Sequence, residues 1–290
     1  MATSAQWIEG ARPRTLPAAI SPVLVGTGAA AFLDHFVWWK ALLALGVALA
    51  LQIGVNYAND YSDGIRGTDE NRVGPLRLVG SKVASPQQVK TAAFSCFGLA
   101  AVLGVVLCAT SNWWLLVAGA ASLVGAWFYT GGKKPYGYRA LGEVSVFLFF
   151  GLVAVLGTTF VQAEKVSWTA VAGAVAIGSL ACALLVANNL RDIPTDTVTG
   201  KRTLAVVLGD QRSRRLYAGL IALAFILASL CALATPWALL ALIALPLGVR
   251  AVRVVVGDAV GPALIPVLKD TGLTELVFAV GLAVGLAIGS

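Results

Sequence analysis

Nine long apolar segments run through this chain, and they restrict its fold more than any other feature. A helix needs about 20 mostly apolar residues to cross a bilayer. The segments that reach or approach this length are 16–33, 38–57, 89–109, 113–129, 141–161, 166–187, 216–234, 237–256 and 272–289. Pro17 and Pro22 interrupt the first segment, but membrane helices tolerate proline where neighbouring helices cover the freed backbone groups. The sequence therefore predicts an all-α, polytopic membrane protein with nine transmembrane helices.

The balance of apolar and charged residues excludes most other classes of protein. Hydrophobic residues make up 58% of the 290 positions and charged residues only 12%, whereas soluble domains carry about 25% charged residues. A chain of this size cannot enclose so much apolar surface in one water-facing core. His35 is the single histidine, which argues against a His-based metal centre. We interpret four cysteines, which lie in apolar runs without a C-x-x-C pair, as buried hydrophobes: Cys96, Cys108, Cys182 and Cys231.

The lysines and arginines predict the orientation of the bundle, because they concentrate in cytoplasmic loops. With nine helices, the N-terminus and every second loop share one side of the membrane. Of the 21 lysine and arginine residues, only Lys40 and Lys165 fall on the other side. We therefore expect a cytoplasmic N-terminus in a bacterial-type cell (inner) membrane. This placement also explains the net charge of +7 without a nucleic-acid partner.

Two long loops on the predicted cytoplasmic side, 59–88 and 188–215, carry clustered acidic residues. If the second helix continues past Tyr57, one of its faces presents residues spaced by three and four, namely Asn56, Asn59, Asp60 and Asp63. The second loop repeats a spacing of four with Asn188, Asp192 and Asp196. Pro194 argues against an unbroken helix through this second cluster, because proline cannot donate to the helix ladder.

Carboxylates stacked on one face at the membrane boundary repel each other unless they share a cation. Oxygen ligands select a hard ion such as Mg²⁺, which proteins typically hold through one or two carboxylates and the phosphates of a substrate. Basic residues suited to a phosphate are interleaved with the aspartates: Arg66, Arg72, Arg77, Arg191, Lys201 and Arg202. The pattern predicts a diphosphate held by Mg²⁺ between two acidic loops. The alternative is that these loops are only solvated and charged.

The two clusters follow the second and the sixth predicted helix. This suggests a duplication of four helices, 1–139 and 140–256, with a ninth helix added, inside a single domain over residues 1–290. Parallel repeats also occur in transporters, so a cation-coupled secondary transporter is an alternative function. A transporter would need ionisable groups near the middle of the bilayer, where this sequence has almost none. Glu143, near the start of the fifth segment, comes closest.

The motifs N-D-Y-S-D-G-I-R-G-T-D from Asn59 and N-N-L-R-D-I-P-T-D-T-V-T-G-K-R-T-L-A from Asn188 resemble the paired aspartate motifs of the UbiA superfamily of intramembrane prenyltransferases. Three further stretches agree with that family: W-I-E-G-A-R-P-R-T-L-P-A-A-I-S-P-V from Trp7, G-P-L-R from Gly74 and Y-T-G-G-K-K-P-Y-G-Y-R-A-L-G-E from Tyr129. The resemblance extends from the N-terminus to about Gly209. It implies a nine-helix bundle around a central cavity, with a polyprenyl diphosphate and an aromatic acid as substrates.

The resemblance also implies roles for individual residues. Asp60 and Asp63 would hold one Mg²⁺ and Asp192 and Asp196 a second, with Asp69 joining the first pair. Asn59 and Asn188 would support these carboxylates. Charge developing on the leaving diphosphate would be met by Arg72, Arg77, Lys201 and Arg202. The acidic aromatic acceptor would meet a short loop that contains Lys133, Lys134, Tyr136 and Tyr138, and Tyr129 would line the site. The positive-inside pattern alone explains the two lysines equally well.

Within the superfamily, the motifs are closest to the branch that prenylates 1,4-dihydroxy-2-naphthoate in menaquinone synthesis. That branch replaces the carboxylate of the acceptor by the prenyl group, so carbon dioxide and diphosphate leave and demethylmenaquinone forms. The acidic loops bind only the diphosphate half of the reaction, so they do not choose among acceptors. A UbiA-type enzyme acting on another aromatic acceptor, such as 4-hydroxybenzoate, is therefore the alternative within the family.

Overall fold

A computed structural model describes residues 2–67 and 76–290, and within these ranges every regular element is a helix. The first half of the chain forms α1 (Ser4–Gly10), η1 (Pro13–Thr15), α2 (Pro17–Phe32), α3 (Trp38–Arg66), α4 (Pro86–Ala109) and α5 (Leu115–Phe128). The next elements are η2 (Tyr136–Tyr138), α6 (Gly142–Val146), a π-helical segment η3 (Phe147–Val153), α7 (Ala154–Ala163) and α8 (Trp168–Val198). The chain ends with α9 (Leu204–Leu208), α10 (Asp210–Cys231), η4 (Pro236–Ala244), α11 (Leu245–Val256), η5 (Gly261–Leu264) and α12 (Ile265–Ile288).

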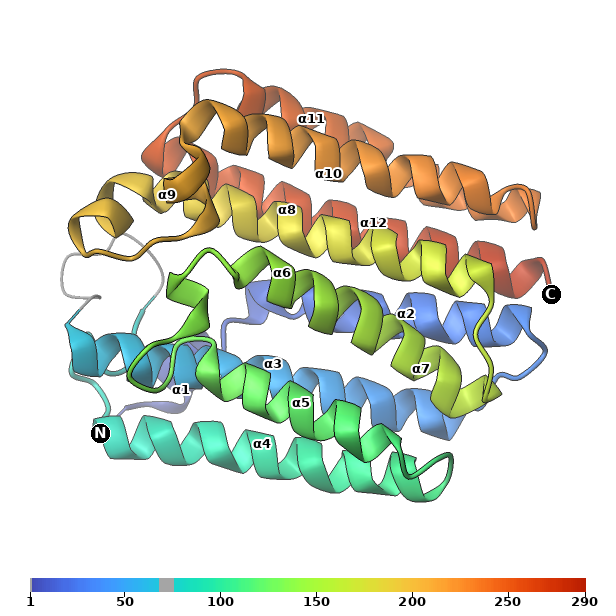
Figure 1. Cartoon of the computed structure of the whole chain (residues 1–290), viewed down its shortest axis with the longest axis horizontal. Helices are drawn as coiled ribbons and strands as arrows, with labels where there is room; N and C mark the ends of the chain where they lie inside the picture. Colours follow the sequence, from blue (N-terminus) through green and yellow to red (C-terminus); the bar gives the residue numbers. More distant parts are fainter. Residues whose placement is uncertain (1, 68–75) are drawn as a thin grey trace.

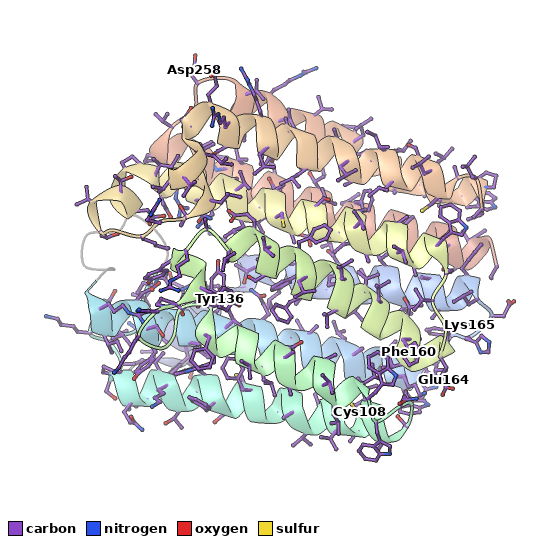
Figure 2. All side chains as sticks on the ribbon, in the orientation of Figure 1. Cys108, Tyr136, Phe160, Glu164, Lys165 and Asp258 are labelled. Carbon is purple, nitrogen blue, oxygen red and sulfur yellow. The ribbon has the colours of Figure 1, made fainter. Side chains whose placement is uncertain are left out.

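Figure 1 shows the long helices aligned along one axis, with α4 and α5 at one edge, α10 and α11 at the other, and α2, α6 and α7 between them. The end of α3, the loop before α6 and helix α9 gather at one end of this bundle. The chain terminates at the opposite end. The two ends also differ in Figure 2, where Tyr136 and Asp258 lie near the first end and Glu164 and Lys165 at the second.

Local sequence explains where several helices begin and end. Ser85 opens α4 with a capping box, in which its hydroxyl accepts from the Gln88 amide and the Gln88 side chain accepts from the Ser85 amide. The hydroxyl of Ser167 caps α8 in the same manner, without the reciprocal bond. Gly67 ends α3 with φ 71°, a left-handed conformation that glycine adopts without a steric penalty.

Seven helices are long and apolar enough to cross a membrane, and an eighth span forms if the pair Ser4–Thr15 and Pro17–Phe32, bent by 50°, is counted as one. The predicted segment 113–129 becomes α5, which has 14 residues. At 1.5 Å per residue, α5 extends about 21 Å, which is less than the roughly 30 Å of a bilayer core. The described residues thus confirm an all-helical membrane bundle with seven to eight candidate spans.

Helix α8 forms the centre of the bundle. Its apolar window is 78% buried, more than that of any other span, and it packs against α10, α12, α2 and η3. A Cβ atom on Gly151 of η3 would lie 2.7 Å from the Cα of Gly178, so the two backbones are in direct contact there. Small residues permit this close approach between membrane helices, where dispersion forces drive the packing.

Lys40 shows how the end of the bundle opposite the acidic clusters is closed. Its side chain is buried in the first turn of α3 and donates to the carbonyl oxygens of Thr110 at 2.9 Å and Val161 at 2.7 Å. A third bond reaches the hydroxyl of Ser111 at 3.1 Å. A cation is favourable here because helices α4 and α7 end at this point with unsatisfied carbonyl groups. Lys165, the other basic residue predicted on this side, is exposed.

Candidate active site

Both acidic clusters lie on continuous helices. Helix α3 runs to Arg66, which confirms that it continues past Tyr57. Helix α8 runs to Val198 with Pro194 inside it, so the expected interruption there was wrong. Proline removes a single backbone donor, and nearby hydroxyls bond to the helix backbone in the same turns, Thr195 to Asp192 O at 2.9 Å and Thr197 to Ile193 O at 2.7 Å. The three-and-four spacing therefore places each cluster on one helix face.

Asp60 holds the segment that follows the first cluster. Its Oδ2 accepts from the Leu78 amide at 2.7 Å and its Oδ1 from the Val79 amide at 3.0 Å. The residue is only 1% exposed. Backbone amides that donate to a carboxylate stabilise its charge. The two bonds also hold the segment that contains Arg77 against the end of α3.

Asp63, one turn further along α3, contacts Tyr138 in η2 and Arg77 in the segment before α4. It is 7% exposed, accepts a hydrogen bond from the hydroxyl of Tyr138, and has an Arg77 guanidinium nitrogen 3.9 Å from its Oδ2. Arg77, which was predicted to meet the charge of the leaving diphosphate, therefore lies beside the first cluster. Tyr138, which sequence reasoning named only as a member of the acceptor loop, directly contacts the cluster.

Tyr138 also connects the two clusters. The guanidinium carbon of Arg66 lies 5.5 Å from the centre of its ring, and the ammonium nitrogen of Lys201 lies 5.2 Å from the same centre. Both distances are within the range of a cation–π interaction. Lys201 in turn lies 3.8 Å from Oδ1 of Asp196, which is buried. A continuous set of contacts thus runs from Asp63 to Asp196 at this end of the bundle.

Backbone pairing holds the two loops together at the same place. The amide of Ala140 donates to the carbonyl of Arg202 at 2.8 Å, and the Arg202 amide donates to the carbonyl of Tyr138 at 3.2 Å. The side chain of Arg202 is exposed. The structure shows Arg202 pairing with the other loop through its backbone, and the predicted contact of its side chain with phosphate stays a prediction.

Asp192 forms a separate unit on α8. The Arg191 guanidinium donates to both of its carboxylate oxygens, at 2.6 and 2.7 Å, and to Oδ1 of Asn188 at 2.9 Å. The predicted pairing of Asn188 and Asp192 on one face is present, with Arg191 between them. The neighbouring Asn189 points elsewhere and donates to Oε1 of Glu143 at 3.0 Å.

Several predicted site residues lie outside this network. Lys133 and Lys134 are exposed on the turn before η2. Asp69 and Arg72 lie outside the described residues. Asn59 is close to the clusters, and its Oδ1 accepts from the hydroxyl of Thr130 at 2.7 Å.

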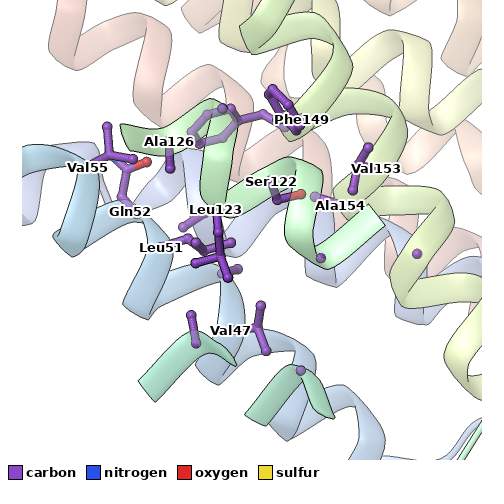
Figure 3. A pocket seen from close by; sticks show the side chains of 18 of the residues that line it. Val47, Leu51, Gln52, Val55, Ser122, Leu123, Ala126, Phe149, Val153 and Ala154 are labelled. Carbon is purple, nitrogen blue, oxygen red and sulfur yellow. The ribbon is translucent and has the colours of Figure 1, made fainter. Parts of the chain in front are cut away.

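A mainly apolar cavity of about 470 Å³ begins beside the first cluster and extends along α3. Asn56 and Asn59 line the end of the cavity nearest the first cluster, together with Tyr129 and Tyr136. The ring centres of these two tyrosines are 5.6 Å apart in a T-shaped arrangement. Further along, Figure 3 shows Val47, Leu51, Leu123 and other aliphatic side chains on its walls. A cavity of the kind that the resemblance implied is therefore present, and its lining comes from α2, α3, α4, α5 and the α6–α7 span, which all precede α8 in the chain.

Tyr136 occupies the wall between the loop and the cavity. Its hydroxyl donates to the carbonyl of Gly125 at 2.6 Å. Burial raises the pKa of the Tyr136 phenol, and a hydrogen bond with Ser145 opposes that increase with a smaller effect. The neutral phenol is therefore the form present at physiological pH, so Tyr136 acts as a hydrogen-bond donor rather than as a base.

The arrangement of the carboxylates determines which metal ion this end of the bundle could hold. Among residues 2–67 and 76–290, no three His, Cys, Asp or Glu side chains lie close enough to enclose an ion by themselves. The described carboxylates stand instead as pairs on two helices. Such pairs fit Mg²⁺, which keeps waters and takes phosphate oxygens from a substrate as further ligands.

Two buried polar residues, Gln52 and Glu275, were not predicted from the sequence. Gln52 lies on the cavity wall, four residues before Asn56. Glu275 is fully buried within α12, away from the clusters. A signal for Gln52 was available, because Gln52 continues the helix face of Asn56 and Asp60 toward the N-terminus at the same spacing of four.

Comparison with known proteins agrees with this architecture. The model of the UbiA prenyltransferase family matches residues 19–260, so the chain belongs to this family. The chain is 60% identical over 289 residues to the 1,4-dihydroxy-2-naphthoate octaprenyltransferase of Mycobacterium tuberculosis, covering 100% of this chain and 99% of the relative. It is 39% identical over 290 residues to the protein of the same name from Escherichia coli, covering 95% and 94%.

A solved structure extends the comparison to the fold. A UbiA homolog from Archaeoglobus fulgidus, bound to DMAPP and Mg²⁺, superimposes with a TM-score of 0.70 over 98% of this chain and 99% of that one, at 16% identity. The resemblance to the UbiA superfamily that the motifs indicated is thus confirmed by both sequence and fold.

Proposed function

We propose that this protein transfers a polyprenyl group from polyprenyl diphosphate to 1,4-dihydroxy-2-naphthoate, with loss of carbon dioxide and diphosphate, and so forms demethylmenaquinol, the two-electron-reduced form of demethylmenaquinone. The full-length relatives named for this acceptor support the choice of reaction. One structural observation carries the proposal. The wall of an apolar cavity includes Asn56 and Asn59 of α3, and the carboxylates of the first cluster, with Arg77 beside them, lie on the same helix next to that wall. This arrangement matches a substrate with a charged head and a hydrocarbon tail.

Two Mg²⁺ ions would be held by the paired aspartates, Asp60 and Asp63 on α3 and Asp192 and Asp196 on α8, together with the diphosphate. Their chemistry when bound is to take up negative charge on the phosphate oxygens. The homolog solved with DMAPP and Mg²⁺ supports metal dependence in this fold. Asp60 is the most enclosed of these residues, and its hydrogen bonds to Leu78 and Val79 give it the second task of holding the loop.

The charged side chains of the site stabilise the leaving group. When the allylic C–O bond of the donor breaks, the diphosphate gains negative charge, and Arg77 and Lys201 lie beside the carboxylates where that charge develops. Tyr138 fixes the direction of the Asp63 carboxylate by donating to it. These groups are positioned before the reaction, so they do not need to reorganise during it.

The cavity protects the allylic cation that the donor leaves behind. Its apolar walls exclude water, and the rings of Tyr129 and Tyr136 present aromatic faces at the reacting end. The exposed Lys133 and Lys134 are placed to attract the carboxylate of the acceptor as it approaches, rather than to contact it in the cavity.

In the membrane, the bent α1–α2 pair and the short helix α5 complete nine spans, with the acidic clusters on the cytoplasmic side of a bacterial-type inner membrane. The positive-inside distribution supports this orientation. α5 would cross with the help of the aromatic residues Trp113 and Trp114, which are exposed at its far end.

The reaction is tested with purified protein in lipid nanodiscs, polyprenyl diphosphate, Mg²⁺ and 1,4-dihydroxy-2-naphthoate labelled at the carboxyl carbon. We expect one labelled carbon dioxide and one diphosphate for each prenyl group attached, and neither product when Mg²⁺ is chelated. A prenylated product that retains the label, or product formed only from 4-hydroxybenzoate, would contradict the choice of acceptor. No diphosphate release with any acceptor would contradict the enzyme class.

A further inference from the structure

Gln52 places a polar group inside the apolar part of the cavity. It lies on α3 eight residues before Asp60, which corresponds to about 12 Å along the helix axis. The residue is only 7% exposed and lines the cavity. Figure 3 shows its side chain near Leu51 and Val55, with the oxygen drawn in red.

The hydrogen bonds of Thr15 fix the orientation of the Gln52 amide. The single hydroxyl proton of Thr15 is donated to the carbonyl of Arg12 at 2.9 Å. Its oxygen accepts from Nε2 of Gln52 at 2.9 Å and from Nδ2 of Asn56 at 2.9 Å. A hydroxyl has only one proton, so Thr15 has none left for an amide oxygen. Gln52 must therefore turn its NH₂ group toward Thr15 and its Oε1 away from it.

Oε1 of Gln52 is buried and has no hydrogen-bond partner among residues 2–67 and 76–290. Most of its surroundings in the cavity are aliphatic side chains. The polar neighbour Ser122 cannot supply a proton, because its hydroxyl donates to the carbonyl of Ala118 at 2.8 Å. A buried acceptor without a partner is unfavourable, so this position favours a ligand that carries a hydrogen-bond donor.

We propose that Oε1 of Gln52 accepts a hydrogen bond from a ring hydroxyl of the aromatic acceptor and thereby selects hydroxylated acceptors. This inference rests on the proposed function and adds a specificity-determining residue to it. The hydrocarbon chain of the donor has no proton to offer, so the donor cannot satisfy Oε1. The acceptor has two hydroxyl groups, and the one at position 1 is already bonded to the adjacent carboxylate of the same molecule. The hydroxyl at position 4 is the free donor.

The test compares 1,4-dihydroxy-2-naphthoate with 1-hydroxy-2-naphthoate, which lacks only the hydroxyl at position 4. Equilibrium binding to the full-length protein in nanodiscs is measured anaerobically, without prenyl donor, so that chemistry does not enter. One hydrogen bond predicts about tenfold tighter binding of the dihydroxy compound by the unmodified protein. Gln52→Met keeps the length of the side chain and removes the amide, so it should bind the two compounds within about twofold.

Ser122→Ala is the matched control, because it removes another polar side chain of the wall whose hydrogen bond is already made within its own helix. It should retain the tenfold preference. Thr15→Val provides a second route if Gln52→Met does not fold. It leaves Gln52 in place but removes the group that orients the amide, and the preference should fall below about threefold.

The outcomes separate this inference from the proposed function. Equal binding of both compounds by the unmodified protein, or a preference that survives both Gln52→Met and Thr15→Val, would overturn the role of Gln52 while leaving prenyl transfer intact. Absence of diphosphate release by the unmodified protein with 1,4-dihydroxy-2-naphthoate would instead count against the proposed function. In kinetic assays, Gln52→Met should raise the KM for the acceptor and leave the KM for polyprenyl diphosphate unchanged.

Discussion

The hydroxyl of Tyr138 donates a hydrogen bond to Oδ1 of Asp63, a residue 75 positions earlier in the chain. The same ring lies beneath the ammonium group of Lys201, which approaches Asp196 on the other acidic helix. One tyrosine therefore sets the relative position of the two carboxylate clusters. A diphosphate held between them depends on that position, and this dependence leads to the first prediction.

Tyr138→Phe should reduce turnover about tenfold or more, because a hydrogen bond to a charged group contributes about 1.5–3 kcal/mol. The ring and its contacts with Arg66 and Lys201 remain, so thermal stability should change little. The measurement is initial rate against Mg²⁺ concentration, and the half-saturating concentration should rise. Tyr61→Phe is the control, since Tyr61 lies on α3 near the same end and stacks on Trp127. Equal rates for both variants would show that Tyr138 does not orient the site.

Asp63→Asn and Asp192→Asn each preserve the size of the side chain and remove its charge. We expect turnover to fall by a factor corresponding to about 3 kcal/mol or more, similar to the loss of one strong electrostatic contact with a transition state. Raising Mg²⁺ should restore part of the rate. Asp258→Asn, an exposed carboxylate at the same end of the bundle, should leave the rate unchanged. If all three variants behave alike, the clusters are only surface charge.

Lys40→Met should lower stability without lowering the activity of the protein that remains folded. The change removes the side-chain donor of the Thr110 carbonyl, at a cost of about 1–3 kcal/mol for a buried group left unpaired. The Val161 carbonyl loses its bond from Lys40 but keeps the one from the Ser111 hydroxyl at 2.9 Å. Thermal unfolding in detergent measures the effect as a decrease in Tm. Lys165→Met changes an exposed lysine at the same end and should have little effect. An unchanged Tm for Lys40→Met would mean that water replaces its bonds.

The dependence of rate on pH should not contain an ionisation of Tyr136. Burial raises the pKa of this phenol in the folded protein, so the neutral form is favoured and is fully present below the ordinary tyrosine pKa of about 10. Its contribution to stability is constant below that pH and is lost only as the pH rises through the raised pKa. Tyr136→Phe should therefore keep the shape of the pH–rate profile from pH 6 to about 9. Loss of one limb of the profile would identify Tyr136 as a catalytic base.

Single cysteines test the orientation in the membrane. In a background without the four native cysteines, Ser81→Cys and Thr199→Cys should be protected from a membrane-impermeant maleimide outside intact cells. Both positions are exposed in the segments that follow the helices of the two clusters. Glu164→Cys, exposed at the opposite end, should react. Labelling of either loop position from outside would reverse the proposed orientation.

The sequence predicted those parts of the structure that depend on local pattern. Apolar length predicted the positions of the spans, and the spacing of three and four predicted that Asn59, Asp60 and Asp63 share a helix face. It could not predict the length of α5, since apolar composition does not mark where a short helix begins and ends. The interruption expected at Pro194 was wrong because proline removes one backbone donor and the rest of the helix remains bonded.

The sequence pattern could not predict contacts between residues that lie far apart in the chain. The bonds of Asp60 to Leu78 and Val79 require the chain to return to the end of α3, and no spacing encodes that return. Tyr138 was one of four candidates in its loop, and only the pairing of that loop with the Arg202 segment distinguishes it from Lys133 and Lys134. The free oxygen of Gln52 likewise depends on Thr15, which lies 37 residues away in the chain.

Side chains of α3 hold residues 7–15 by hydrogen bonds, so this N-terminal segment is tied to the helix that lines the cavity. Asn56 donates to the carbonyl of Ala11 at 2.9 Å, and Tyr57 donates to the carbonyl of Trp7 at 2.9 Å. An engineered version trimmed beyond Trp7 would thus lose contacts of the helix that carries Gln52 and Asn56, even though no carboxylate of the clusters is touched. The C-terminus, at the far end of the bundle, is the place to attach a purification tag or a fluorescent reporter.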